Sequence, residues 1–112
     1  MTNELATAPT ARDTTLSETI AATLEQAKVV EDRAFVSALG RGMLVLSVFE
    51  HEQSLTHQQI CAATGLAKAT VSRLIHTLER LDLLKRTEDE RYQLAKSLLK
   101  LSSSAWLSLI HI

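Results

Sequence analysis

The sequence predicts a mainly α-helical domain with one small β-hairpin, arranged as a winged helix-turn-helix. Two segments with helical spacing, 57–64 and 68–81, are separated by a three-residue turn that begins with Gly65. Two short runs of strand-forming residues, 83–87 and 91–94, follow directly and predict the hairpin that forms the wing. With 112 residues, three glycines and one proline, the chain has the size of one domain and too few turn residues for an all-β protein.

An acidic leader, residues 1–33, precedes this domain. Residues 1–32 carry two basic and six acidic residues, whereas residues 33–101 carry ten basic and seven acidic ones, so the net charge of −1 conceals a mildly basic domain. Residues 1–14 are rich in threonine and alanine and are predicted to be disordered. From Thr15, a capping-box sequence and apolar residues at helical spacing favour a helix, although this thin apolar stripe fits a frayed leader equally well.

The next helix is predicted to run from Ser37, as its N-cap, to Glu50. Gly40 and Gly42 lower its helix propensity, a cost that the close approach of another helix to this face would explain. The buried face is expected to consist of Leu39, Met43, Leu46 and Phe49, backed by Val45.

The first helix of the helix-turn-helix has the clearest local signal in the chain. Thr56 and Gln59 suit a capping box, and Leu55 and Ile60 suit the hydrophobic staple that accompanies it. Gly65 suits the left-handed residue that follows the last turn of a helix. We therefore expect a short helix that starts one residue after Thr56 and stops just before the glycine.

The second helix of the motif is expected from Lys68 to Leu81. Its apolar face follows the i, i+3, i+4, i+7 spacing and comprises Val71, Leu74, Ile75, Leu78 and Leu81. An ordinary helical hairpin has the same spacing, and the β-hairpin that follows favours the winged helix-turn-helix.

Basic and small polar side chains occupy the outward face of this second helix, a pattern that suits DNA. Basic side chains neutralise phosphates, and side chains near the start of such a helix reach base edges. Arg73 is a candidate for a bidentate contact to guanine, Ala69 for contact with a thymine methyl group, and Lys68 and Arg80 for phosphates. The predicted DNA-binding residues are Lys68, Ala69, Thr70, Ser72, Arg73, His76, Arg80 and, at the base of the wing, Arg86 and Arg91. For Arg73 the alternative is a solvated charge on the surface of the helix.

Three acidic residues, 88–90, form the tip of the wing, and phosphates would repel them. We expect the tip to stay away from the DNA backbone. The last segment, 96–112, is expected to be a linker helix with an apolar stripe. We favour a dimer contact, or docking to a further domain, over packing of this stripe on its own domain. The stripe comprises Leu98, Leu101, Ala105, Trp106 and Leu109.

Other classes of function find little support in the sequence. The four histidines are scattered, no nucleophile and base are suitably spaced, and three glycines do not supply a phosphate-binding loop, so we expect neither an enzyme nor a cofactor site. Cys61 has no cysteine partner, which argues against a metal site and against an intrachain disulfide. No signal peptide or membrane span is apparent, so we expect a soluble cytoplasmic protein without a membrane partner.

Several stretches together resemble the N-terminal DNA-binding domain of IclR-type transcription regulators, and most closely the branch that controls aromatic catabolism. The resemblance covers about residues 33–107 and rests on segments 35–43, 55–56, 64–75, 92–94 and 98–101. It implies a homodimer that binds an inverted-repeat operator of double-stranded DNA at the bacterial nucleoid, and that represses or activates in response to a small-molecule effector.

The chain departs from the family pattern in two places. Asp82 stands where the family usually has glycine after the recognition helix, and aspartate tolerates the left-handed conformation better than most residues. Family members also continue into an effector-binding domain, which these 112 residues do not include. We therefore expect a winged helix-turn-helix at 34–95 and a linker helix at 96–112, before such a domain. The main alternative function is a winged helix that docks proteins, for which the outward face of the second helix would be apolar.

Overall fold

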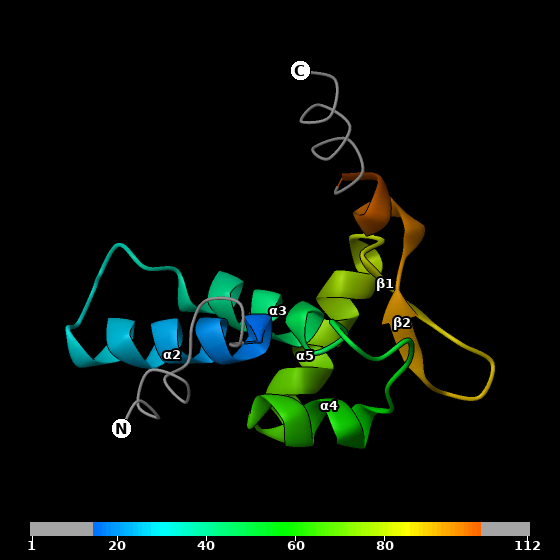
Figure 1. The fold of residues 1–112 in the computed structure, drawn as a ribbon, viewed down its shortest axis with the longest axis horizontal. Coiled ribbons are helices and arrows are strands. Elements are labelled where there is room, and N and C mark those ends of the chain that lie inside the picture. Colours follow the sequence, from blue (N-terminus) through cyan, green and yellow to red (C-terminus); the bar gives the residue numbers. More distant parts are fainter. Residues whose placement is uncertain (1–14, 102–112) are drawn as a thin grey trace, which may run out of the picture.

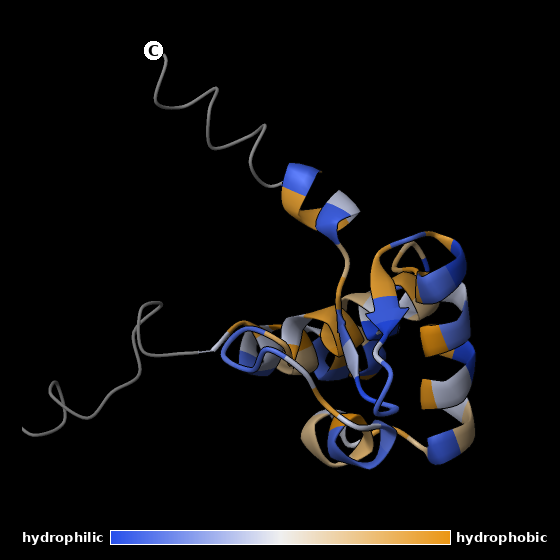
Figure 2. Ribbon diagram, turned by 90° about the vertical axis from the view of Figure 1, so that its right-hand side faces the viewer, coloured by the Kyte–Doolittle hydropathy of each residue, from blue (hydrophilic) through white to orange (hydrophobic). Residues whose placement is uncertain are grey.

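The computed structural model describes residues 15–101 and confirms the predicted fold class (Figure 1). Its elements are α2 (Leu16–Val29), α3 (Ser37–Ser47), α4 (His57–Thr64), α5 (Lys68–Arg80), β1 (Leu84–Arg86) and β2 (Tyr92–Leu94). Residues 96–101 are helical as well. The helices are banded with hydrophilic and hydrophobic residues, as expected for helices with one buried face (Figure 2). Within the described residues, no helix is both long and apolar enough to cross a membrane.

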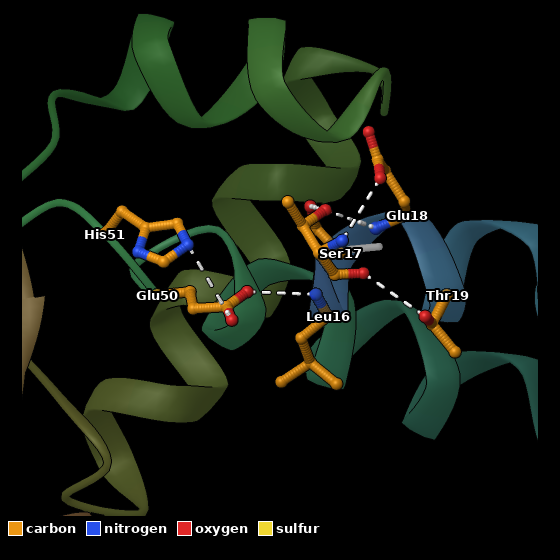
Figure 3. A network of polar contacts seen from close by, with 7 residues as sticks. Leu16, Ser17, Glu18, Thr19, Glu50 and His51 are labelled. Atoms are coloured by element: carbon orange, nitrogen blue, oxygen red, sulfur yellow. Dashed lines mark hydrogen bonds and ion pairs between the residues drawn. The ribbon is translucent and has the colours of Figure 1, made fainter. Parts of the chain in front are cut away.

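Helix α2 begins at a capping box, as the sequence suggested. The Thr15 hydroxyl accepts a hydrogen bond from the Glu18 amide, and the Glu18 carboxylate accepts one from the Thr15 amide, each at 3.1 Å. The Leu16 amide donates to Oε1 of Glu50 at 2.9 Å, and Nε2 of His51 lies 3.8 Å from the other carboxylate oxygen of Glu50 (Figure 3). The start of α2 is therefore tied to the segment that follows α3, and the helical alternative for the leader is confirmed from Leu16 onward. The predicted disorder of 1–14 lies outside the described residues.

Helix α2 packs closely against α3 at Gly40. A Cβ atom at Gly40 would lie 2.8 Å from Cδ2 of Leu24 and 3.3 Å from the ring of Phe35. The expected close approach is thus confirmed at this position. The same expectation is wrong for Gly42, where a Cβ atom would have no neighbour within 4 Å.

This contrast predicts opposite outcomes for two alanine substitutions in one helix. We expect Gly42→Ala to raise the free energy of unfolding by about 0.5–1 kcal/mol, because alanine loses less backbone entropy in a helix. We expect Gly40→Ala not to raise the free energy of unfolding, because the Leu24 side chain must move to admit the methyl group. Urea denaturation followed by circular dichroism measures both values, and an equal gain at the two sites would contradict the close packing of Leu24 on Gly40.

Helix α3 begins at Ser37, the first residue of the predicted range, but its N-cap and its C-terminal end differ from the prediction. Val36 is the N-cap and makes no side-chain capping bond, so the prediction of Ser37 as the cap is wrong, and the helix ends at Ser47 rather than Glu50. The expected buried face is wrong in part as well. Leu44, Val45, Leu46 and Phe49 are buried, whereas Leu39 and Met43 are 66% and 44% exposed.

The two exposed residues of α3 line an apolar groove of about 470 Å³ between α3 and α5. Helices α2 and α5 both pack on α3, but they leave Leu39 and Met43 exposed. Leu81 lines the same groove and is 61% exposed. It is the C-cap of α5, so the predicted apolar face of that helix is buried only as far as Leu78.

Helices α4 and α5 form the predicted helix-turn-helix. The capping box of Thr56 and Gln59 is present, and Gly65 has φ 73°, in the left-handed region. Ile60 and Val71 have no exposed surface, and both belong to the core cluster with Leu55. These contacts hold the two helices together.

Strands β1 and β2 form an antiparallel hairpin in which Leu84 pairs with Leu94. The hairpin is joined to the helical part by two backbone hydrogen bonds between Leu55 and Tyr92, of 3.0 and 2.8 Å. Asp82 has φ 63°, so the turn after α5 is made with aspartate in the left-handed region, as expected. Its carboxylate accepts a hydrogen bond of 2.6 Å from the hydroxyl of Ser97 in the helical residues that follow β2.

Candidate nucleic-acid interface

The outward face of α5 carries the side chains that the sequence selected for DNA contact. Those of Lys68, Ala69, Ser72, Arg73, His76 and Arg80 are all exposed, and that of Thr70 is partly buried. Val71, Ile75 and Leu78 are buried on the opposite face. Glu79 is the single acidic residue of the helix, and it lies in the last turn. The exposed surface of α5 is therefore hydrophilic and basic along most of its length.

The start of α5 favours negative charge. Its N-cap, Ala67, has no side-chain acceptor for the amides of the first turn, and Lys68 follows at the first helical position. The amides at a helix N-terminus and a lysine side chain both attract anions. This end of the helix therefore suits the approach of negatively charged phosphates, which accept hydrogen bonds from helix N-termini and from lysine side chains in protein–DNA complexes.

His57 joins the two helices of the motif, a contact that the sequence analysis did not foresee. Its Nε2 atom lies 2.9 Å from Oγ of Ser72, and its Nδ1 atom lies 3.6 Å from Sγ of Cys61. These three residues, with Gln58 and Lys68, line a shallow depression of about 580 Å³. The spacing of four residues between His57 and Cys61 was the available signal. Within residues 15–101, no group of three or more potential ligands is arranged for a metal.

Arg91 connects the wing to the start of α4. Its Nε atom donates to the hydroxyl of Ser54 at 2.8 Å, and its Nη2 atom donates to the carbonyl of Ser54 at 3.1 Å and to Oε1 of Gln59 at 3.4 Å. The same Gln59 oxygen accepts the amide of Thr56 in the capping box. Three donor–acceptor contacts of this guanidinium are thus made within the domain, which holds the base of the wing against the helix-turn-helix.

Arg86 is also engaged within the domain. Its Nη2 atom donates to the hydroxyl of Tyr92 at 2.9 Å, and its guanidinium lies 5.3 Å from the centre of that ring. Its Nε atom lies 4.0 Å from the carboxylate of Glu79. Both arginines at the base of the wing therefore have a structural role, in addition to the DNA contact predicted for them.

The tip of the wing is acidic and exposed, as the sequence indicated. Glu88, Asp89 and Glu90 are all exposed, and Glu90 has φ 61° in the turn. The hydroxyl of Thr87 donates to the Asp89 carboxylate and holds its pKa below the ordinary value, and the nearby charge of Arg91 lowers it further. Asp89 therefore stays negatively charged at neutral pH and adds to the repulsion of phosphates.

The predicted dimer stripe lies partly within the described residues. Leu98 is partly buried and packs on the core of its own domain, whereas Leu101 is 70% exposed. Ala105, Trp106 and Leu109 lie outside the described residues. For Leu98 the structure shows the intradomain contact that the sequence analysis had weighed as the alternative.

Comparisons with known proteins agree on one family. Residues 38–88 match the family model of the IclR helix-turn-helix domain. The chain is 47% identical over 49 residues to the HTH-type transcriptional regulator TsaQ1/TsaQ2 of Comamonas testosteroni, a match that covers 44% of this chain and 18% of the relative.

Solved structures show the same fold. An IclR family transcriptional regulator from Brucella abortus superposes with a TM-score of 0.62 and 47% identity, over 67% of this chain and 29% of that one. A putative IclR regulator from a Silicibacter species gives a TM-score of 0.58 over 65% of this chain and 29% of the other, at 22% identity, which supports the fold alone. The chain thus spans less than a third of each relative. The winged helix-turn-helix of this chain therefore resembles the helix-turn-helix domains of IclR regulators in both sequence and fold.

Proposed function

We propose that this domain binds double-stranded DNA sequence-specifically, as the DNA-binding part of an IclR-type transcription regulator, with α5 in the major groove. The observation that carries the proposal is the exposed face of α5, which is hydrophilic and basic and has no acidic residue before Glu79. Phosphate contacts supply affinity, and the side chains between Lys68 and His76 are placed to reach base edges. The match of residues 38–88 to the IclR helix-turn-helix domain supports the same assignment.

A protein-docking winged helix is the second candidate, and the apolar groove between α3 and α5 is the observation that favours it. Leu39, Met43 and Leu81 are exposed along this groove. These apolar residues do not extend over the outward face of α5. In a protein-docking module, that outward face would be apolar. Thr70 and Arg73 also line the groove, so it adjoins the proposed DNA surface, and the polar face of α5 favours DNA.

The finer features of the proposal follow the regulators that the chain resembles. We propose a homodimer that binds an inverted repeat in the bacterial cytoplasm and that represses or activates transcription. A small-molecule effector would act through a domain other than the winged helix-turn-helix. The exposed Leu101 and the hairpin-to-helix connection at Ser97 are compatible with a dimer contact made by the segment after β2.

Selection of bound fragments from a random DNA pool at near-physiological salt tests the proposal. We expect an inverted repeat with half-sites about one helical turn, or a multiple of it, apart. Recovery of no common sequence, with binding that collapses as salt rises, would leave only phosphate contacts and would favour the docking candidate. Sedimentation of the chain with and without the selected duplex measures its oligomeric state independently.

The acidic wing tip gives a prediction about non-specific binding. We expect the triple variant Glu88→Gln, Asp89→Asn, Glu90→Gln to bind an unrelated duplex about threefold more tightly at low salt, because three charges that repel phosphate are removed. The gain in affinity should disappear as salt is added, because salt screens the same repulsion in the unaltered protein. Fluorescence anisotropy over a series of salt concentrations measures it.

A matched control removes the same charge elsewhere. Glu25→Gln, Glu31→Gln and Asp32→Asn neutralise three exposed acids of α2 and the turn after it, so they change net charge equally without altering the wing. If the wing variant gains no more than this control at low salt, the tip does not approach DNA.

A further inference from the structure

His57 is the side chain through which α4 touches the outward face of α5. It is the first residue of α4, and its ring reaches Ser72, which lies beside Arg73 on the proposed recognition surface. Ser72 is exposed and His57 is partly buried. A hydrogen bond to an exposed hydroxyl contributes little to folding stability, so its main physical effect is to orient the hydroxyl.

We propose that His57 is a positioning residue that sets the hydrogen-bonding role of Ser72 toward DNA, and thereby determines sequence preference at the base pair next to Ser72. This inference rests on the proposed function. An unrestrained serine hydroxyl rotates and can either donate or accept. Nδ1 of His57 lies 3.6 Å from Sγ of Cys61 and Nε2 lies 2.9 Å from Oγ of Ser72. We assign the ring proton to Nε2, the tautomer in which Cys61 donates to Nδ1 and His57 donates to Ser72. The serine proton is then directed outward, and Ser72 acts as a donor.

A fixed donor in the major groove discriminates between bases. Guanine presents the acceptors N7 and O6, adenine N7 and thymine O4, whereas the exposed edge of cytosine is a donor. Ser72 oriented by His57 would therefore favour an acceptor at its base and disfavour cytosine. The contact of Nδ1 with the Cys61 thiol helps to hold the ring in this orientation.

The surroundings of His57 make this orientation stable. The backbone at the start of α4 is fixed by the capping box of Thr56 and Gln59, and Gln59 is held in turn by Arg91 from the wing. A recognition group is most selective when its supporting contacts lie on rigid elements. Here a chain of contacts runs from the wing through the start of α4 to the exposed face of α5.

The test uses the full chain and the selected DNA site. For each variant, the affinity for this site and for single-base variants of it is measured at one salt concentration. We expect His57→Ala to lower the ratio of specific to non-specific affinity about fivefold, the scale of one lost hydrogen bond. Ser72→Ala should weaken the preference at the same base pair. The double variant should weaken this preference no further than Ser72→Ala does.

Two further variants separate positioning from structure. His57→Gln should recover most of the discrimination, because its amide can donate to Ser72 from a similar position. Gln58→Ala, in the same depression, should leave the base preference unchanged. Thermal midpoints are recorded for every variant. If His57→Ala fails to fold, the other two variants test the inference. It then requires that His57→Gln retains the base preference and that Ser72→Ala loses it.

The outcomes distinguish this inference from the proposed function. If the unaltered chain discriminates but His57→Ala discriminates equally well, the positioning role is overturned and the DNA-binding function stands. If the losses of the two single variants multiply in the double variant, His57 acts independently of Ser72 and the inference also fails. If the unaltered chain shows no base preference at all, both are overturned.

Discussion

Replacing Arg73 by alanine is expected to weaken binding to the selected DNA site by about 1–3 kcal/mol, which is one to two orders of magnitude in affinity. Arg73 is exposed in the first half of α5, on the face opposite the buried residues Val71 and Ile75. A guanidinium in this place reaches N7 and O6 of guanine with two parallel hydrogen bonds. Titration against the selected site and against a site with that guanine replaced measures the loss and assigns it to one base.

Two other substitutions serve as controls for Arg73→Ala. Arg73→Lys keeps the charge but not the planar pair of donors, so it should lose most of the discrimination and less of the total affinity. Lys68→Ala should weaken binding to all sequences alike and reduce the slope of log affinity against log salt by about one. If Arg73→Ala weakened selected and altered sites equally, Arg73 would be a phosphate contact and not a reader of bases.

The largest effect on stability is expected at Ile60. This side chain has no exposed surface and lies in the core cluster that α4 and α5 share. Ile60→Ala should lower the free energy of unfolding by about 2–5 kcal/mol, because it removes buried apolar contacts and leaves a cavity. A domain of this size is stable by only about 5–15 kcal/mol in total, so the variant should be close to the limit of folding. Urea denaturation measures the change.

A milder substitution at the same site supplies the control. Ile60→Val removes one methylene group and should cost about 0.5–1.5 kcal/mol. DNA affinity measured well below the thermal midpoint should change little for Ile60→Val, because the exposed face of α5 is untouched. A loss below 1 kcal/mol for Ile60→Ala would mean that α4 is not held mainly by this residue.

Features that depend on a few neighbouring residues were predicted well from the sequence. The capping boxes at Thr15 and Thr56 and the left-handed Gly65 each involve residues three or four apart, so the pattern contains all the groups that form them. The amphipathic pattern of α5 was equally informative, since a strong apolar period leaves only one face to bury. The candidate DNA face followed directly from it.

The errors occur where distant elements decide the outcome. The spacing of apolar residues in α3 is compatible with more than one buried face. The packing of α2 and α5 on α3 leaves Leu39 and Met43 exposed. The pair His57 and Ser72 is separated by 15 residues and the pair Ser54 and Arg91 by 37, so no local pattern could join them. For the same reason Arg91 was predicted only as a DNA contact, although its hydrogen bonds also hold the wing in place.

The hydrogen bond between Ser97 and Asp82 has a consequence for operator architecture. It joins residues 96–101 to the turn at the end of α5, so it restrains the direction in which the chain leaves the wing relative to the proposed recognition helix. In a dimer assembled through this segment, the separation of the two recognition helices would be set by the geometry of that turn. A glycine at position 82 would remove the bond, and under the proposed dimeric function we expect it to widen the range of spacer lengths that one dimer accepts. Asp82 would then restrict operators by spacing and not by base sequence.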